Sequence, residues 1–130
     1  MAKGHRTQIK KERNEATREK RPHASVKFAP VSATKAKIVL DSIKGKDVRT
    51  AKAMLLYSPR YASRIIEKVL NSAVANAENN LGMDVSKLYV EETQAGQAPT
   101  MKRIQPRAQG RAFRIMKRQS HISIILNEKE

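Results

Sequence analysis

Apolar residues recur at helical spacing in three consecutive stretches of the chain. Each stretch places its apolar side chains three or four positions apart, which predicts a helix with one face packed against a core. The three stripes are Ala36, Val39, Leu40 and Ile43; Val48, Ala51, Met54 and Leu55; and Tyr61, Ile65, Ile66, Val69, Leu70, Ala73, Val74 and Ala77.

Capping residues mark where these helices begin and end. Ser32 and Asp47 stand in N-cap positions before the first and second helix, and Gly45 stops the first. Pro59 stands at the first position of the third helix, where its missing N–H costs nothing, and that helix ends near Asn79–Gly82. Its second half contains Ala73, Ala75 and Ala77, small residues that predict close packing on a sheet.

Two other regions alternate apolar and polar residues with the period of a strand. The first runs from His23 to Pro30 around Val26 and Phe28, and Pro30 ends it. The second begins at Ser86 and is matched far downstream, so that the two segments form the ends of one long antiparallel hairpin. Its alternating apolar residues are Leu88, Val90, Ile122, Ile124 and Leu126.

The middle of this hairpin is predicted to protrude as an arm, about residues 96–114. Pro106 and Gly110 place the reversal at about residues 104–110, with the strands paired near the body and the basic residues splayed toward the tip. About eight residues per strand beyond Gly96 would reach about 25 Å past the domain. Because an isolated two-stranded ribbon is marginal in water, we expect a partner to order it.

Charge is concentrated in the arm and at the N-terminus. The net charge is +15, and residues 93–127 contain seven Lys or Arg and no acidic residue. Cations at such density repel one another, and a phosphate backbone relieves the repulsion. With an aromatic content of 4%, contacts should run mainly from cations to phosphates rather than through base stacking. The predicted RNA-binding residues are Lys102, Arg103, Arg107, Arg111, Arg114, Lys117 and Arg118.

Residues 1–22 form a second basic segment, predicted as an extension before a single domain over residues 23–130. It contains eight Lys or Arg, three Glu and almost no apolar side chain, and it stops at Pro22. Such a segment buries too little apolar surface to fold alone, so it is expected to be disordered or a frayed helix. Ordering against nucleic acid is favoured over an inert solubilising tail.

Catalytic and metal-site patterns are absent from the sequence. His5, His23 and His121 have no metal-ligand spacing, and His121 is expected to be a plain sheet residue. Glu91 and Glu92, adjacent on a strand, should point to opposite faces and cannot act as an acid–base pair. With no Cys, no Gly-rich phosphate loop, no secretory signal and no bilayer-spanning apolar run, we expect a cytoplasmic protein without cofactor or enzymatic activity.

The arm and the third helix resemble a known family. The run Pro99–Ala112, which contains Met-Lys-Arg-Ile-x-Pro-Arg-Ala-x-Gly-Arg, continues through Arg114–Ile122, and Leu70–Asn80 matches on the third helix. Together these segments closely resemble large-subunit ribosomal protein twenty-two of bacteria. The match extends from about Ser25 to Asn127, whereas residues 1–22 depart from the shorter family start and Phe113 is not required by the motif.

The resemblance implies an α+β fold, with three helices packed on a small three-stranded antiparallel sheet and a long protruding β-hairpin. It implies a structural component of the large ribosomal subunit that binds large-subunit rRNA, aids assembly and is a monomer within the ribosome. Neighbouring ribosomal proteins and the nascent peptide would be further partners, without a membrane. The body would lie near the exit of the peptide tunnel, and the hairpin tip would line its wall.

The resemblance also implies which residues form the tip, where changes in the family alter the response to macrolides. On this interpretation Met101, Lys102 and Arg103 lie nearest the tip, whereas Arg114, Lys117 and Arg118 lie on the shaft of the arm. The implied tip residues are Met101, Lys102, Arg103, Arg107, Gly110 and Arg111.

Two other classes of protein share parts of the pattern. Bacterial nucleoid proteins also have β-ribbon arms with Arg and a tip Pro, but they need two arms, hence a dimer, around DNA. Size in solution and preference for folded RNA over duplex DNA would discriminate the two. A membrane-active cationic domain ranks last, because no basic amphipathic helix with a bulky apolar face is present.

Overall fold

The computed structural model describes residues 3–17 and 20–129 of the chain, so residues 1, 2, 18 and 19 of the predicted extension and residue 130 of the predicted domain lie outside it. Four helices, three strands and two short 3-10 turns form the described part. In chain order they are α1 (Lys3–Thr17), β1 (His23–Ala29), α2 (Ala33–Ile43), α3 (Val48–Tyr57), α4 (Tyr61–Leu81), η1 (Val85–Lys87), β2 (Leu88–Pro106), η2 (Ala108–Gly110) and β3 (Ala112–Glu128).

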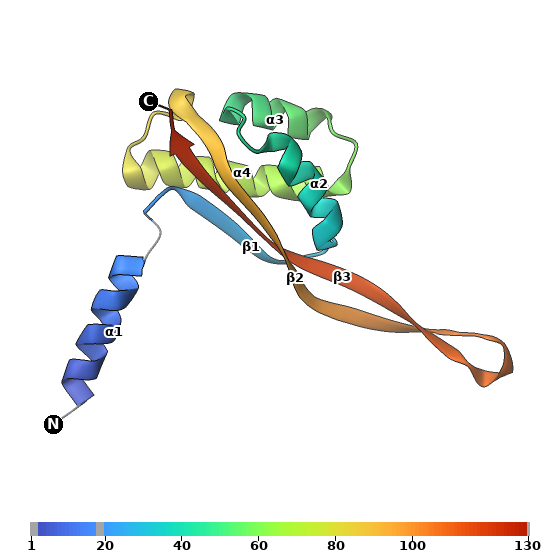
Figure 1. Ribbon diagram of the computed structural model, residues 1–130. Helices are drawn as coiled ribbons and strands as arrows, with labels where there is room; N and C mark the ends of the chain where they lie inside the picture. The colour runs from blue at the N-terminus through green and yellow to red at the C-terminus, as the bar shows by residue number, and fades with distance from the viewer. Residues whose placement is uncertain (1–2, 18–19, 130) are drawn as a thin grey trace.

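The three strands form one antiparallel sheet in the order β1-β3-β2, with β3 in the centre. Helices α2, α3 and α4 lie together on this sheet, and β2 and β3 continue far beyond them as a twisted ribbon (Figure 1). The predicted α+β fold with a protruding hairpin is therefore confirmed.

The core lies between the helices and one face of the sheet. Along β3, residues at even positions from Ser120 to Leu126 are buried, whereas the odd positions between them are half-buried. This alternation follows from the pleat of a strand, which turns successive side chains to opposite faces. The largest fully buried side chains are Leu40, Ile43, Ile66, Leu70, Leu88, Val90, Ile122, Ile124 and Leu126.

Two of the predicted helix signals have the expected local geometry. The Ser32 hydroxyl accepts a hydrogen bond from the N–H of Lys35 at 3.4 Å, which caps the start of α2. At the end of α4, Gly82 adopts a left-handed conformation with φ of 63°, which glycine tolerates without a steric penalty. Its N–H donates to the carbonyl of Glu78 at 3.1 Å, so that the last turn is closed.

The predicted start of α4 at Pro59 is wrong. Arg60 occupies the N-cap with an extended backbone, and the helix begins at Tyr61. The buried Ser63 explains the later start. Its N–H donates to the carbonyl of Arg60, and its hydroxyl donates to the hydroxyl of Ser58 at 2.8 Å. As the first residue of the helix, Tyr61 is 63% exposed rather than part of the core stripe.

Three further details of the helices differ from the sequence prediction. Met54, predicted to belong to the apolar stripe, is 39% exposed, whereas Val48, Ala51 and Leu55 of the ten-residue α3 are buried. Ala75 is exposed, since it lies about 200° around the helix from Ala73. Asp47 occupies the N-cap of α3 as predicted, but its carboxylate makes no capping hydrogen bond and pairs instead with Lys129.

The expectation that Glu91 and Glu92 point to opposite faces is also wrong. The pairing of β2 with β3 shifts register between Val90 and Glu92, which indicates a bulge at Glu91. Both carboxylates consequently reach the guanidinium of Arg21, at 2.8 Å from Glu91 and 3.5 Å from Glu92. These acidic groups therefore anchor the start of the body.

His121 has a more specific role than the plain sheet residue predicted. In β1 the register shifts between Val26 and Ala29, and Phe28 takes a positive φ of 56°. The N–H of Phe28 donates to Nδ1 of His121 at 3.1 Å, and the two rings meet edge to face at 4.9 Å. His121 thus supports the irregularity at which β1 ends.

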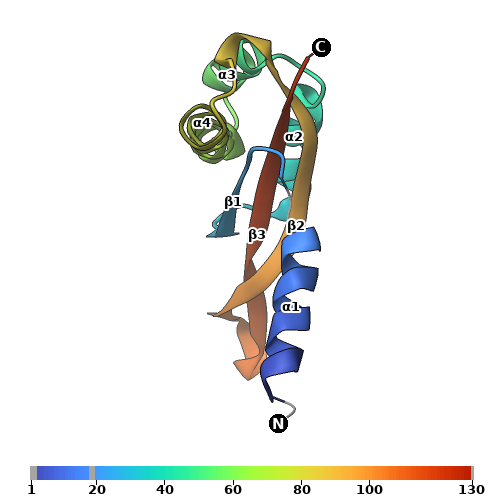
Figure 2. The same ribbon diagram turned by 90° about the vertical axis from the view of Figure 1, so that its left-hand side faces the viewer.

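The extension contains the 15-residue helix α1, which stands apart from the helices on the sheet (Figure 2). Its described side chains, residues 7–17, are all exposed. A helix of this length is marginal in water without packing, consistent with the expectation of a segment that frays on its own. Its predicted ordering against nucleic acid stays a prediction.

Candidate nucleic-acid interface

The arm begins where β1 leaves the sheet. The last pair between β1 and β3 joins Ala29 to Ser120, and Pro30 follows. From there β2 and β3 continue as a two-stranded ribbon, with a register shift between Ala98 and Met101 at the position of Pro99. Proline has no N–H to donate to the hydrogen bonds between strands, so it is expected at an irregularity of this kind. The pairs of the outer arm run from Met101–Lys117 to Pro106–Ala112.

The tip of the arm is a compact turn over residues 107–111. The N–H of Arg107 donates to the carbonyl of Arg111 at 2.8 Å, which closes the turn. Gln109 and Gly110 both have positive φ, 59° and 67°, and the second is favourable because glycine has no Cβ. The reversal therefore lies later than the centre of the predicted range 104–110, and the strands are paired up to the turn.

A cation–π contact between the turn and β3 supports this turn. The guanidinium carbon of Arg107 lies 5.2 Å from the ring centroid of Phe113, within the range of a cation–π interaction. Phe113 is the residue that the family motif does not require, and the structure gives it this contact with the tip.

Cationic and apolar side chains alternate on both faces of the ribbon. Because directly paired residues share a face, Met101 lies with Lys117 on one face, and Lys102 lies with Met116 on the other. The next pairs repeat the mixture, with Arg103 opposite Ile115 and Ile104 opposite Arg114. Neither face is purely apolar, so the ribbon is not built to lie on a protein core.

All seven predicted RNA-binding residues are on this arm and exposed: Lys102, Arg103, Arg107, Arg111, Arg114, Lys117 and Arg118. No acidic residue is present between residues 93 and 127. The structure thus brings the cations together on one projection, at a distance from the acidic groups of the body. Such a projection attracts a polyanion from either side.

The predicted order of residues along the arm is partly wrong. Met101 lies opposite Lys117 at the foot of the outer arm, and Arg103 lies opposite Ile115 only two pairs farther out. Arg114, assigned to the shaft, is farther out than either of them. Of the implied tip residues, Arg107, Gly110 and Arg111 are in the turn itself. The turn closes only at residues 107–111, which leaves Met101 and Arg103 several pairs behind it.

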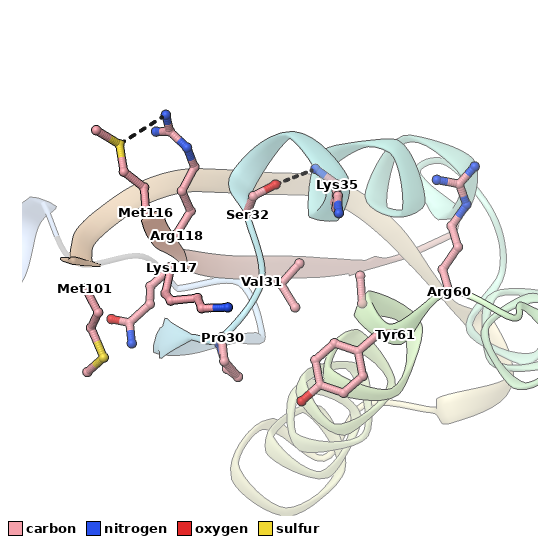
Figure 3. A pocket seen from close by; sticks show the side chains of 12 residues that line it. Pro30, Val31, Ser32, Lys35, Arg60, Tyr61, Met101, Met116, Lys117 and Arg118 are labelled. Atoms are coloured by element: carbon pink, nitrogen blue, oxygen red, sulfur yellow. Dashed lines mark hydrogen bonds between the residues drawn. The ribbon is translucent and has the colours of Figure 1, made fainter. Parts of the chain in front are cut away.

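Sequence analysis also missed a groove at the foot of the arm. It has a volume of about 830 Å³ and lies among the loop after β1, the start of α4 and residues 116–119 of β3. Figure 3 shows Lys117 and Tyr61 on opposite sides of Pro30 and Val31. The cationic residues that line it are Lys35, Arg60, Lys117 and Arg118. The sequence signal was ambiguous, because Tyr61 also fits the apolar stripe of α4.

Metal and membrane features are absent from the described residues. Nowhere among residues 3–17 and 20–129 do three His, Cys, Asp or Glu side chains gather as metal ligands. No helix in the same part of the chain is long and apolar enough to cross a membrane.

Comparison with known proteins identifies the relationship that this geometry reflects. The family model of ribosomal protein L22p/L17e matches residues 24–127, which include helices α2–α4, the whole arm and all of the sheet except its end residues His23 and Glu128. The chain belongs to this family. The match agrees with the resemblance seen between Ser25 and Asn127, and it makes the chain a structural ribosomal protein rather than an enzyme.

Individual relatives extend the comparison to the N-terminus. Large ribosomal subunit protein uL22 of Lachnoclostridium phytofermentans is 66% identical over 129 residues, which cover 99% of this chain and 100% of the relative. The protein of the same name from Lachnospira eligens is 62% identical with the same coverage. That of Clostridium acetobutylicum is 56% identical over 107 residues, 82% of this chain and 96% of its own length. The extension before residue 24 therefore lies outside the family model, although some relatives match it.

Proposed function

We propose that this chain is an architectural component of the large ribosomal subunit and binds large-subunit rRNA through its arm. The observation that carries the proposal is the ribbon of paired strands with seven exposed cations and no acidic residue. Membership of a ribosomal protein family and relatives named for the large subunit support the same partner. The protein would act in the cytoplasm as a monomer within the ribosome.

The distribution of charge over both faces suggests how the arm binds. A ribbon that lies on the surface of an RNA would need cations on one face only. Here Lys117 and Lys102 lie on opposite faces, and so do Arg103 and Arg114. The arm therefore threads between RNA segments and neutralises phosphates on each side, which supports assembly of the subunit because separate segments are held together. The body would contact rRNA and neighbouring ribosomal proteins.

The tip would then line the nascent-peptide exit tunnel, with the body near the tunnel exit. Residues 107–111 are the part of the ribbon farthest from the helices (Figure 1). They present the guanidinium groups of Arg107 and Arg111 on a closed turn. Such a turn can narrow a passage without contributing to the core, and its positive charge would act on a passing peptide.

The first prediction concerns salt. If the arm neutralises about six phosphates, the logarithm of the affinity for large-subunit rRNA should fall with the logarithm of the salt concentration at a slope of about −4 to −5. Filter binding of the full-length protein over a range of monovalent salt measures this slope. Duplex DNA of the same length serves as the competitor and should displace little rRNA.

A flat salt response would contradict the electrostatic basis of the proposal. Equal competition by duplex DNA, together with a dimer in sedimentation, would instead favour the nucleoid alternative.

The second prediction separates the tip from the rest of the arm. Replacing Arg107 and Arg111 with Ala should change the free energy of unfolding by less than about 1 kcal/mol, because both side chains are exposed and one weak cation–π contact is lost. The variant should still be recovered in salt-washed large subunits, since five cations remain on the arm. The response to macrolides or the passage of particular nascent chains should change.

The matched control removes two exposed cations from the body, with Lys37 and Lys44 replaced by Ala. It changes net charge equally and should alter neither drug response nor nascent-chain passage. Absence of the tip variant from the subunits would show that the turn anchors assembly. Normal recovery with unchanged drug response and passage would place the tip away from the tunnel.

A further inference from the structure

The groove at the foot of the arm has the geometry of a second RNA contact. We propose that it binds an unpaired nucleotide of the RNA, with phosphates on its cations and the base stacked on Tyr61. This inference rests on the proposed function, because it takes RNA as the partner. It adds a single-stranded element to a contact that was expected to run mainly from cations to phosphates.

The groove arises from the end of a strand. β1 pairs with β3 as far as Ala29 and Ser120, and the chain then turns through Pro30 toward α2. Beyond this point β3 lacks its neighbour on that side, and residues 116–119 form one wall of the groove. The opposite wall is the start of α4, where the helix begins at Tyr61. The hollow is therefore a built feature of the fold, fixed by where β1 stops.

The charge of the groove is uniformly positive. Lys35, Arg60, Lys117 and Arg118 line it, and no acidic residue is among the lining residues. Within the described part of the chain none of the four has an ion-pair partner, although the Arg118 guanidinium approaches the Met116 sulfur at 3.8 Å. Three elements contribute these cations, and of the two consecutive residues on β3, Arg118 extends toward Met116 whereas Lys117 extends toward Pro30 (Figure 3).

The apolar part of the groove suits a base. Tyr61 is 63% exposed, and Met101, on the same face of the ribbon as Lys117, is 50% exposed, whereas Met116 lies on the opposite face. An exposed aromatic ring beside cations is the combination by which proteins hold single-stranded nucleic acid, since every base has a face that can stack. A base within a duplex has both faces covered by its neighbours, so only an unpaired nucleotide can use the ring.

An extended acidic peptide is the competing occupant, because a free strand edge can accept another strand. The proposal favours RNA for two reasons. Lys117 and Arg118 belong to the same cationic ribbon, so a strand bound to the arm continues into the groove. The wide apolar and aromatic lining also fits a flat base better than a charged side chain.

The test uses full-length protein and a ten-nucleotide single-stranded RNA that contains 2-aminopurine, whose fluorescence reports stacking. Binding to the wild-type protein should change the fluorescence. Tyr61→Ala should abolish that change and weaken affinity about tenfold with the salt slope unaltered, whereas Tyr61→Phe should restore both. Replacing Lys35 and Arg60 with Gln should lower the salt slope by about 1.4 in magnitude.

Tyr57→Ala is the matched control, because Tyr57 is 84% exposed and does not line the groove. It should bind like the wild type. Wild-type behaviour of Tyr61→Ala would overturn the proposal, and so would displacement of the RNA from the groove by a ten-residue poly-glutamate at equal concentration. A steep salt slope with large-subunit rRNA alongside either result would leave the function of the arm intact. A flat slope would overturn the proposed function itself.

Discussion

Replacing residues 99–118 with an Asn-Gly pair is expected to leave the body folded and to weaken binding to large-subunit rRNA by about three orders of magnitude. The excised segment contains all seven cations of the arm. Ala98 and Gln119 face each other in the ladder, so a two-residue turn can join them without a change of register. Asn-Gly is the pair that such a turn favours.

The body should keep its stability because its buried hydrophobic residues all lie outside residues 99–118. Thermal unfolding should therefore give a midpoint within a few degrees of the wild type. Filter binding against rRNA at fixed salt measures the lost affinity, and the salt slope should become much shallower.

A second variant keeps the ribbon and removes its charge, with all seven Lys and Arg replaced by Gln. It should bind almost as weakly as the excised protein, because phosphate contacts supply most of the affinity. Wild-type affinity of the excised variant would remove the arm as the interface. Strong binding by the Gln variant alone would show that the shape of the ribbon, and not its charge, holds the RNA.

The elements that could be predicted from sequence are those fixed by local chemistry. The apolar stripe of α2, its Ser32 cap and the left-handed Gly82 at the end of α4 depend on residues within a few positions of each other. The alternation in β3 depends only on the pleat. These local signals agree with one another, so the α+β fold follows from them.

The features that could not be predicted depend on register over long separations. Lys117 and not Met116 lies opposite Met101 only because the ladder shifts by one residue between Ala98 and Met101. The bulge at Glu91 similarly brings two carboxylates to Arg21, seventy positions earlier in the chain. No local pattern encodes such a shift.

The groove was hidden for a related reason. Its cations, from Lys35 to Arg118, come from segments that are far apart in sequence. Residues 23–92 contain eleven Lys or Arg and seven acidic residues, and this mixture along the chain concealed a local excess. Only the packing of α4 beside the end of β1 brings those side chains together.

The last prediction tests how closely α4 packs on the sheet. Ala73 is fully buried on α4, which packs against β1 and β3, whereas Ala75 on the same helix is exposed. Ala73→Phe should lower the free energy of unfolding by about 1–3 kcal/mol, because the added ring forces the helix away from a filled interface. The melting temperature should fall by several degrees or more.

Ala75→Phe is the matched control, since it adds the same ring to the same helix at an exposed position. Its effect on the free energy of unfolding should be within about 0.5 kcal/mol. Chemical denaturation of both variants, with equal slopes against denaturant, gives the comparison. Equal destabilisation by the two substitutions would mean that helix propensity and not packing sets the cost. A stable Ala73→Phe would show that the helix and the sheet can separate without loss, and the core would then be looser than its buried alanines indicate.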